Sequence, residues 1–209
     1  MKRILFQGDS ITDAERSREN DGNRGIGYAT LVTAFLGAER PSEFEFINRG
    51  ISGNRVIDLL ARVKSDIINL KPDYLSILIG VNDVWHELAH RNGVDAEQYE
   101  VYYHMLLEQL LRALPDVRLL ILEPFVLNGS ATRENWDMFR EETEKRAAAA
   151  KRIAEKHHVL FVPLMEKFDI AAESAPAEYW LYDGVHPTAM GHELIKREWL
   201  RAFERLERN

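Results

Sequence analysis

Three residues whose side chains can together carry out nucleophilic catalysis stand at opposite ends of this 209-residue chain. Ser10 follows the apolar run 4–6, and Asp183 and His186 lie in the segment 183–187. A serine hydroxyl is a weak nucleophile unless a base removes its proton, and a histidine oriented by a carboxylate is such a base. The segment 183–187 contains glycine and proline, so a short loop there could hold Asp183 against one imidazole nitrogen and leave the other for Ser10.

Attack by a serine also creates an oxyanion that needs hydrogen-bond donors. Two turns, 48–53 and 80–83, each directly follow a predicted strand. They offer the backbone N–H of Gly53 and the side-chain amide of Asn82. The competing interpretation of the first block is that Asp9 and Ser10 only cap a helix, because both residue types are favoured at that position.

These side chains can meet only if the elements before them share one edge of a sheet. Short apolar runs rich in β-branched and aromatic residues predict five strands, at 4–6, 44–48, 74–79, 117–122 and 159–162. Amphipathic or alanine-rich segments between and after them predict helices at 28–36, 56–70, 95–114, 137–157, 164–175 and 188–206. The charged, glycine-bearing stretch 14–27 reads as a surface loop.

Strands that alternate with helices are typical of a parallel sheet covered on both faces. We therefore predict an α/β fold, a three-layer α/β/α sandwich with a five-stranded parallel sheet, forming a single domain over residues 1–209. A flavodoxin-like strand order, 2-1-3-4-5, would place the carboxyl ends of the first three strands side by side. Ser10, Gly53 and Asn82 follow those three strands, so the order predicts that they converge.

The four blocks that carry these residues resemble those of the SGNH hydrolases, also called the GDSL esterase family. The resemblance spans Gly8 to Pro187, with isoleucine in the first block where the family name has leucine. It implies that Ser10 is the nucleophile and first oxyanion donor, Gly53 and Asn82 the other donors, His186 the base and Asp183 its orienting carboxylate. It also implies an SGNH hydrolase fold and a serine esterase that needs no cofactor and no metal.

A rival motif follows the Asn82 block. His86, Glu87 and His90 match H-E-x-x-H, in which two histidines one helical turn apart bind zinc and the glutamate activates water. Against a zinc hydrolase, Asn92 and Gly93 cut the segment short, and the sequence marks no third ligand, although Glu108 or Glu123 could be proposed. The better interpretation is a short polar helix at the rim of the site.

The substrate is indicated less directly. Polar and charged residues surround the tryptophans that flank the site, Trp85, Trp136 and Trp180, whereas a lipase would need a continuous apolar groove. Within the SGNH family, residues 80–85 and 183–187 look most like the intracellular carbohydrate esterases that remove acetyl groups from xylo-oligosaccharides. This resemblance implies an acetylated sugar as the small-molecule ester substrate. Asp9, Trp85 and Trp180 are the candidate substrate contacts.

Three other functions stay open alongside the zinc hydrolase. A thioesterase or a lysophospholipase would use the same family machinery on a different ester. A non-catalytic flavodoxin-like binding domain would keep the fold, but it would have no need of Asn82, Asp183 and His186 together. An acyl-chain series separates the first two from an acetylesterase.

The composition limits the classes of binding partner that the chain could have. The formal charge of −7 and the absence of a long basic run argue against a nucleic-acid surface and give no reason to expect an anionic membrane as partner. The chain has no cysteine, which excludes disulfides and thiol catalysis. The apolar run at the amino terminus ends at Gln7, too early for a secretory core, so we expect a cytoplasmic enzyme. The sequence leaves open whether the chain forms a homo-oligomer.

Overall fold

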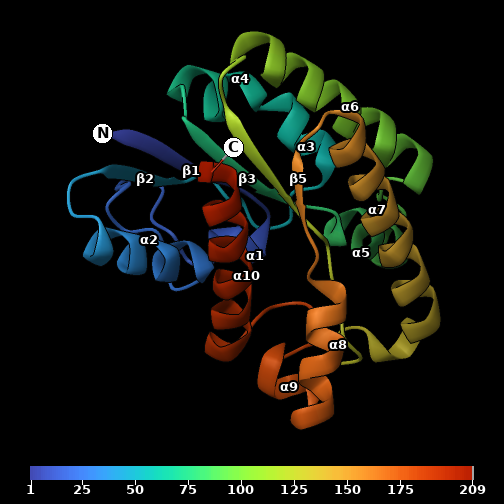
Figure 1. The fold of residues 1–209 in the computed structure, drawn as a ribbon. Coiled ribbons are helices and arrows are strands. Elements are labelled where there is room, and N and C mark those ends of the chain that lie inside the picture. The colour runs from blue at the N-terminus through green and yellow to red at the C-terminus, as the bar shows by residue number, and fades with distance from the viewer. Residues whose placement is uncertain (209) are drawn as a thin grey trace.

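The computed structural model describes residues 1–208, which contain a five-stranded parallel sheet in the order β2-β1-β3-β4-β5 (Figure 1). The strands are β1 (Lys2–Gly8), β2 (Phe44–Asn48), β3 (Tyr74–Leu78), β4 (Arg118–Leu122) and β5 (Leu160–Val162). All four strand pairings are parallel. The predicted fold class and strand order are therefore confirmed.

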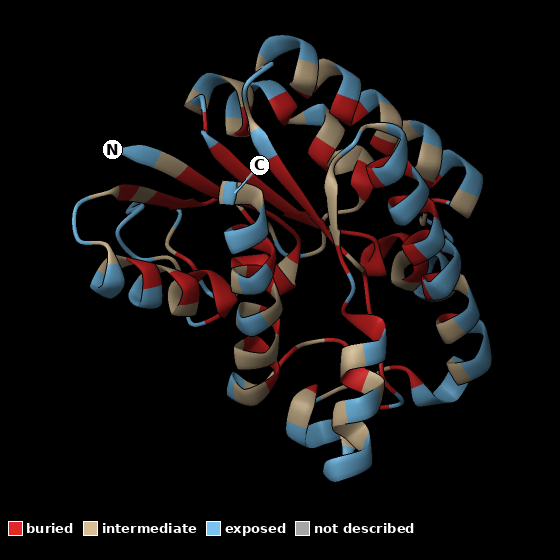
Figure 2. Cartoon of the chain, in the orientation of Figure 1, coloured by how far each residue is buried: buried red, intermediate tan, exposed pale blue. Residues whose placement is uncertain are grey.

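The sheet lies between two layers of helices, and Figure 2 shows its central strands, β3 and most of β4, in the red of buried residues. Successive side chains of a strand point to opposite faces, and β1 sends Ile4 and Phe6 into one apolar core and Leu5 into the other. The first core packs under α2 (Tyr28–Glu39) and α10 (Ala189–Arg208), and the second packs under α3 (Val56–Ala61), α6 (Ala96–Ala113) and α7 (Trp136–Lys156). The remaining elements are α1 (Ser10–Asp13), α4 (Val63–Asp66), η1 (Ile68–Leu70), α5 (Val81–His90), η2 (Arg133–Asn135), α8 (Met165–Ser174) and α9 (Ala177–Trp180).

The prediction of one continuous helix over 56–70 is wrong, because the structure divides that segment into α3, α4 and η1. Arg62 ends α3 with a backbone ψ of 12°. Its guanidinium donates to the carbonyl oxygens of Gly8 and Arg49, at 3.2 and 2.9 Å, and to Oδ1 of Asn54, at 2.7 Å. These contacts tie the break in the helix to the carboxyl edge of the sheet.

The strand register brings the carboxyl ends of the first three strands together. Phe6 pairs with Asn48 on one side of β1, and Gly8 pairs with Leu78 on the other. The turns that carry Ser10, Gly53 and Asn82 therefore leave the sheet at neighbouring points. Within residues 1–208, no helix combines the length and the hydropathy that a membrane crossing requires.

Candidate active site

Ser10 is the first residue of α1 and sits at the end of β1. The carboxylate of Asp9 caps this short helix by accepting the Ile11 N–H at 3.0 Å. The turn before it requires glycine, because a Cβ on Gly8 would lie 2.3 Å from the Leu78 carbonyl oxygen. The capping interpretation of this block and the nucleophile interpretation are thus compatible: Asp9 caps the helix and thereby presents Ser10.

A tight turn over residues 183–186 holds the histidine. Oδ1 of Asp183 accepts the backbone N–H groups of Val185 and His186, at 2.9 and 2.8 Å, and Oδ2 lies 2.7 Å from Nδ1 of His186. On the other side of the ring, Nε2 of His186 lies 2.9 Å from Oγ of Ser10. Gly184 adopts a φ of +97°, a left-handed angle that side chains disfavour. The structure thus aligns Asp183, His186 and Ser10 in one hydrogen-bonded row.

The negative charge of Asp183 in this row makes the imidazole of His186 more basic. Burial by itself would lower the pKa of His186, but the hydrogen bond to Asp183 and the charge of that carboxylate outweigh it and raise the pKa above 6.5. Burial would also raise the pKa of Asp183, yet its hydrogen bonds from His186 and Val185 hold that pKa below the ordinary value. Asp183 therefore stays ionised next to an imidazole that readily accepts a proton.

The two predicted oxyanion donors lie in the same cavity as Ser10. A space of about 350 Å³ is lined by Ser10, Ser52, Gly53, Asn82, Trp85, His86, His90 and His186. Asn82 belongs to the first turn of α5 rather than to a loop, and its Nδ2 donates to the Asn54 carbonyl oxygen at 3.1 Å. Because an amide nitrogen carries two hydrogens, this bond leaves a second for an oxyanion. Gly53 has a φ of +81°, which favours glycine.

Sequence reasoning missed two buried carboxylates in these blocks, Asp13 and Asp83. Asp83 is next to Asn82, and both of its oxygens accept the Val56 N–H, at 3.1 and 3.2 Å, so it fastens the segment after Gly53 to α5. Burial raises the pKa of Asp83 well above its usual value. The signal available in the sequence was the position of Asp83. It is an acidic residue directly beside the candidate donor Asn82, in a stretch that must otherwise pack on the sheet.

The three expected substrate contacts differ in where they lie. Trp85 lines the cavity, with its ring centroid 5.7 Å from that of His186. Trp180 instead lines a separate groove between α9 and α10 and is not part of the lining of the Ser10 cavity. The Asp9 side chain is 1% exposed and is turned inward as a helix cap. Burial raises the pKa of Asp9 to about 7.

Tyr182 is an aromatic neighbour that sequence reasoning did not single out. Its ring stacks on His186 with centroids 5.6 Å apart and planes 16° apart. It helps to line a second cavity of about 300 Å³, which shares Ser10, Ser52 and His186 with the first. The site is therefore a trough with two lobes that meet at the serine and the histidine.

The H-E-x-x-H residues do not form a metal centre. His86 and His90 lie one turn apart on α5 with ring centroids separated by 6.3 Å. Glu87 turns to the end of the helix, where it accepts the Gly93 N–H at 3.0 Å. In the part of the chain that the structure describes, no group of three or more metal-ligating side chains is suitably placed. The residues present therefore do not fit a catalytic zinc.

Comparisons with known proteins agree with this geometry. The family model described as GDSL-like Lipase/Acylhydrolase matches residues 6–194. An acetylxylan esterase from Geobacillus stearothermophilus is 34% identical over 210 residues, which cover 96% of this chain and 93% of that protein. Its crystal structure superposes with a TM-score of 0.86 at 33% identity, covering 96% of this chain and 93% of that one. A Parabacteroides merdae protein named for the same GDSL-like lipase family gives a TM-score of 0.89 at 38% identity, over 97% of this chain and 95% of that one.

Proposed function

We propose, from the premise that the chain belongs to the GDSL-like lipase/acylhydrolase family and is a carboxylic ester hydrolase, that it works through an acyl-enzyme on Ser10. We further propose that it removes acetyl groups from xylo-oligosaccharides or related sugars. The observation that supports the mechanism is the row of hydrogen-bonding distances from Asp183 through His186 to Ser10, 2.7 and 2.9 Å long.

In the proposed reaction, Nε2 of His186 removes the Ser10 proton while Oγ attacks the ester carbonyl. The Ser10 and Gly53 backbone N–H groups and the Asn82 amide donate to the oxyanion. The imidazolium then protonates the leaving alcohol, and the acyl group stays on Ser10. Water, deprotonated by the same histidine, releases the acid and restores the serine.

The lining of the trough supports a small acyl group and a polar leaving group. Beside the oxyanion donors, the cavity is lined by Ser52 and by the rings of Trp85, His86 and His90. The other lobe places Tyr182 and Glu15 near Ser10, an aromatic face with a hydrogen-bonding carboxylate, a combination suited to a sugar ring. The acetylxylan esterase relative favours the same substrate class.

An organophosphonate that modifies serine tests the mechanism. Mass spectrometry should find the adduct on Ser10, and labelling should fail in His186→Ala because the hydroxyl then lacks its base. The Arg140→Ala variant is the control, since Arg140 pairs with Asp169 and Glu144 away from the site. A label on another residue, or undiminished labelling without His186, would contradict the proposal.

An acyl-chain series on one leaving group tests the substrate. Turnover should fall from acetate to butyrate and reach background by octanoate, because each added methylene finds no slot that could supply its roughly 0.8 kcal/mol of burial. Acetylated xylobiose should exceed an aryl acetate in kcat/KM if the sugar binds. A maximum at octanoate would move the assignment to a lysophospholipase or a thioesterase, and acetate preference without a gain from sugars would contradict the sugar substrate alone.

A further inference from the structure

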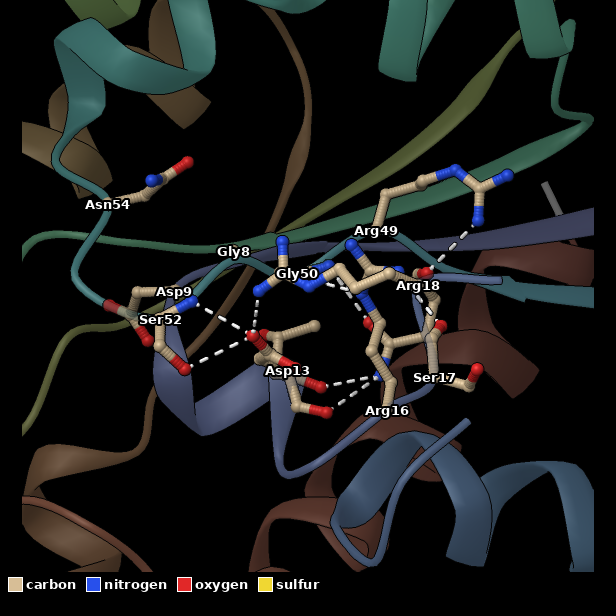
Figure 3. Close-up of polar contacts among 12 residues, drawn as sticks. Gly8, Asp9, Asp13, Arg16, Ser17, Arg18, Arg49, Gly50, Ser52 and Asn54 are labelled. Atoms are coloured by element: carbon tan, nitrogen blue, oxygen red, sulfur yellow. Dashed lines mark hydrogen bonds and ion pairs between the residues drawn. The ribbon is translucent and has the colours of Figure 1, made fainter. Parts of the chain in front are cut away.

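The carboxylate of Asp13 connects α1, the helix that carries Ser10, to residues 49–55, the loop that carries Gly53 and is called the donor loop below. Asp13 lies one helical turn after Ser10 on α1 and is 4% exposed. Its Oδ2 accepts two hydrogen bonds from Ser52, one from the backbone N–H at 3.0 Å and one from Oγ at 3.1 Å (Figure 3). Ser52 immediately precedes Gly53, so this carboxylate acts on the peptide unit next to the proposed donor.

The loop is fastened to α1 up to that point. Gly50 packs directly on the helix, since a Cβ there would lie 2.3 Å from the Asp13 nitrogen. Arg16 donates through Nε to the Gly50 carbonyl oxygen at 2.7 Å, and the Ile51 N–H donates to the Gly8 carbonyl oxygen at 3.0 Å. The two bonds from Ser52 to Asp13 are the last of these attachments before Gly53.

Gly53 itself has little packing that could fix it. An ideal Cβ at this residue would meet only Cε1 of His86 within 4 Å, at 3.9 Å. The direction of its N–H therefore depends on the residues on either side. On the far side, the Asn54 N–H donates to the Ile51 carbonyl oxygen at 3.1 Å and closes a turn around Gly53, and Val56 is held to Asp83. On the near side, Ser52 is held to Asp13.

We propose that Asp13 is a positioning residue that holds the Gly53 N–H in register with Oγ of Ser10. The proposal rests on the oxyanion role assigned to Gly53 under the proposed function. Asp13 and Ser10 belong to the same helical turn. A movement of Ser10 therefore also moves the Asp13 carboxylate and the donor loop that is bonded to it. An oxyanion donor acts mainly on the transition state, so loss of this register should lower kcat and leave KM nearly unchanged.

The same oxygen of Asp13 offers a matched control. Arg18 donates to Oδ2 at 2.8 Å, but its side chain is 52% exposed and makes no bond to the donor loop. Arg18 therefore approaches the buried carboxylate from the solvent side, opposite in role to the bonds from Ser52. Arg18→Ala removes this contact with Oδ2 and leaves both bonds from Ser52 in place.

The experiment compares Asp13→Ala, Asp13→Asn, Arg18→Ala and Ser10→Ala on an aryl acetate. Asp13→Ala should lose about 10- to 100-fold in kcat with KM changed less than about twofold, a fraction of the loss for removing a donor outright. Asp13→Asn keeps an oxygen acceptor for Ser52 and should recover most of that loss. Arg18→Ala should match the wild type within about twofold. A boronic acid that mimics the tetrahedral adduct should bind Asp13→Ala more weakly by the factor lost in kcat.

The readouts separate positioning from a merely structural role. Activity is expressed per folded molecule, with circular dichroism as the measure of folding. The proposal would be overturned if Asp13→Ala changed only the folded fraction, or only KM, and left kcat per folded molecule unchanged. If Asp13→Ala does not fold, Ser52→Ala removes the hydroxyl bond alone and should still lower kcat severalfold. Full kcat in Asp13→Ala with an inactive Ser10→Ala refutes the role of Asp13 only. Activity that survives in Ser10→Ala refutes the proposed function itself.

Discussion

The turn at 183–186 and the helix α5 both bring histidine to the Ser10 cavity, and each has a carboxylate three residues before a histidine, Asp183 before His186 and Glu87 before His90. In the turn, Asp183 receives two backbone N–H groups and faces the imidazole of His186 at 2.7 Å. In the helix, Glu87 binds the Gly93 N–H instead, and the rings of His86 and His90 stand 6.3 Å apart. The same residue types therefore give an ordered base in one segment and an unconnected pair in the other.

Backbone hydrogen bonding explains the difference. The N–H groups inside a helix are used by the helix itself, so Glu87 finds its backbone donor beyond the end of α5, at Gly93, and not beside an imidazole. A turn leaves its N–H groups free, and those of Val185 and His186 fix the rotamer of Asp183. The two segments therefore differ in whether the backbone holds the carboxylate against an imidazole, and the following predictions test that contrast.

The largest expected effect separates the two segments directly. His186→Ala should lower turnover of an aryl acetate by about 10⁴- to 10⁶-fold, because removal of a triad member removes the base. His90→Ala should stay within about threefold of the wild type, since neither a metal nor a carboxylate depends on that ring in the described residues. Initial rates of both variants at saturating substrate decide the point, and comparable losses would overturn the contrast.

The acid of the turn should have a distinct pH signature. Asp183→Asn should lower kcat by about 10⁴-fold, because the amide favours the wrong imidazole tautomer. Asp183 is what raises the pKa of His186 above 6.5, and burial would lower it. The residual activity should therefore begin at lower pH than in the wild type.

The acidic limb of kcat/KM, followed from pH 5 to 9, measures the pKa of the base in the free enzyme. Asp9, with a pKa of about 7, is present in both proteins and does not account for a difference between them. An unmoved limb would mean that the titrating group is not His186.

These two segments also show what the sequence could and could not reveal. Hydrophobic patterning located the strands, and a flavodoxin-like strand order then predicted that Ser10, Gly53 and Asn82 converge, since parallel strands place their following turns at one edge. The bond from Gly93 to Glu87, the inward Asp9 and the place of Trp180 in a separate groove depend on side-chain direction. The space open to a side chain is set by residues that are distant in the sequence. The Leu78 carbonyl oxygen, which leaves no room for a Cβ at Gly8, is an example, and no local sequence pattern reveals it.

A substitution at the first turn of α5 sharpens the contrast within one helix. Asn82→Ala should lower kcat by about 10²- to 10³-fold with little change in KM, because the amide donates to charge that develops only in the transition state. The amide also bonds to the Asn54 carbonyl oxygen, so Asn82→Asp, which keeps the shape but loses the donor, is the matched variant. A change confined to KM would make Asn82 a ground-state contact instead.

The smallest expected effect concerns metal at the second and third turns of the same helix. Prolonged EDTA treatment should leave kcat/KM of the wild type within about 20% of its starting value, since a catalytic zinc needs three protein ligands and α5 offers two imidazoles. The double variant His86→Ala/His90→Ala should respond to EDTA in the same way. Elemental analysis of the purified protein gives the independent measure. One tightly bound zinc per chain, with activity lost on its removal, restored on its addition and absent from the double variant, would show that α5 and not the turn at 183–186 carries the chemistry.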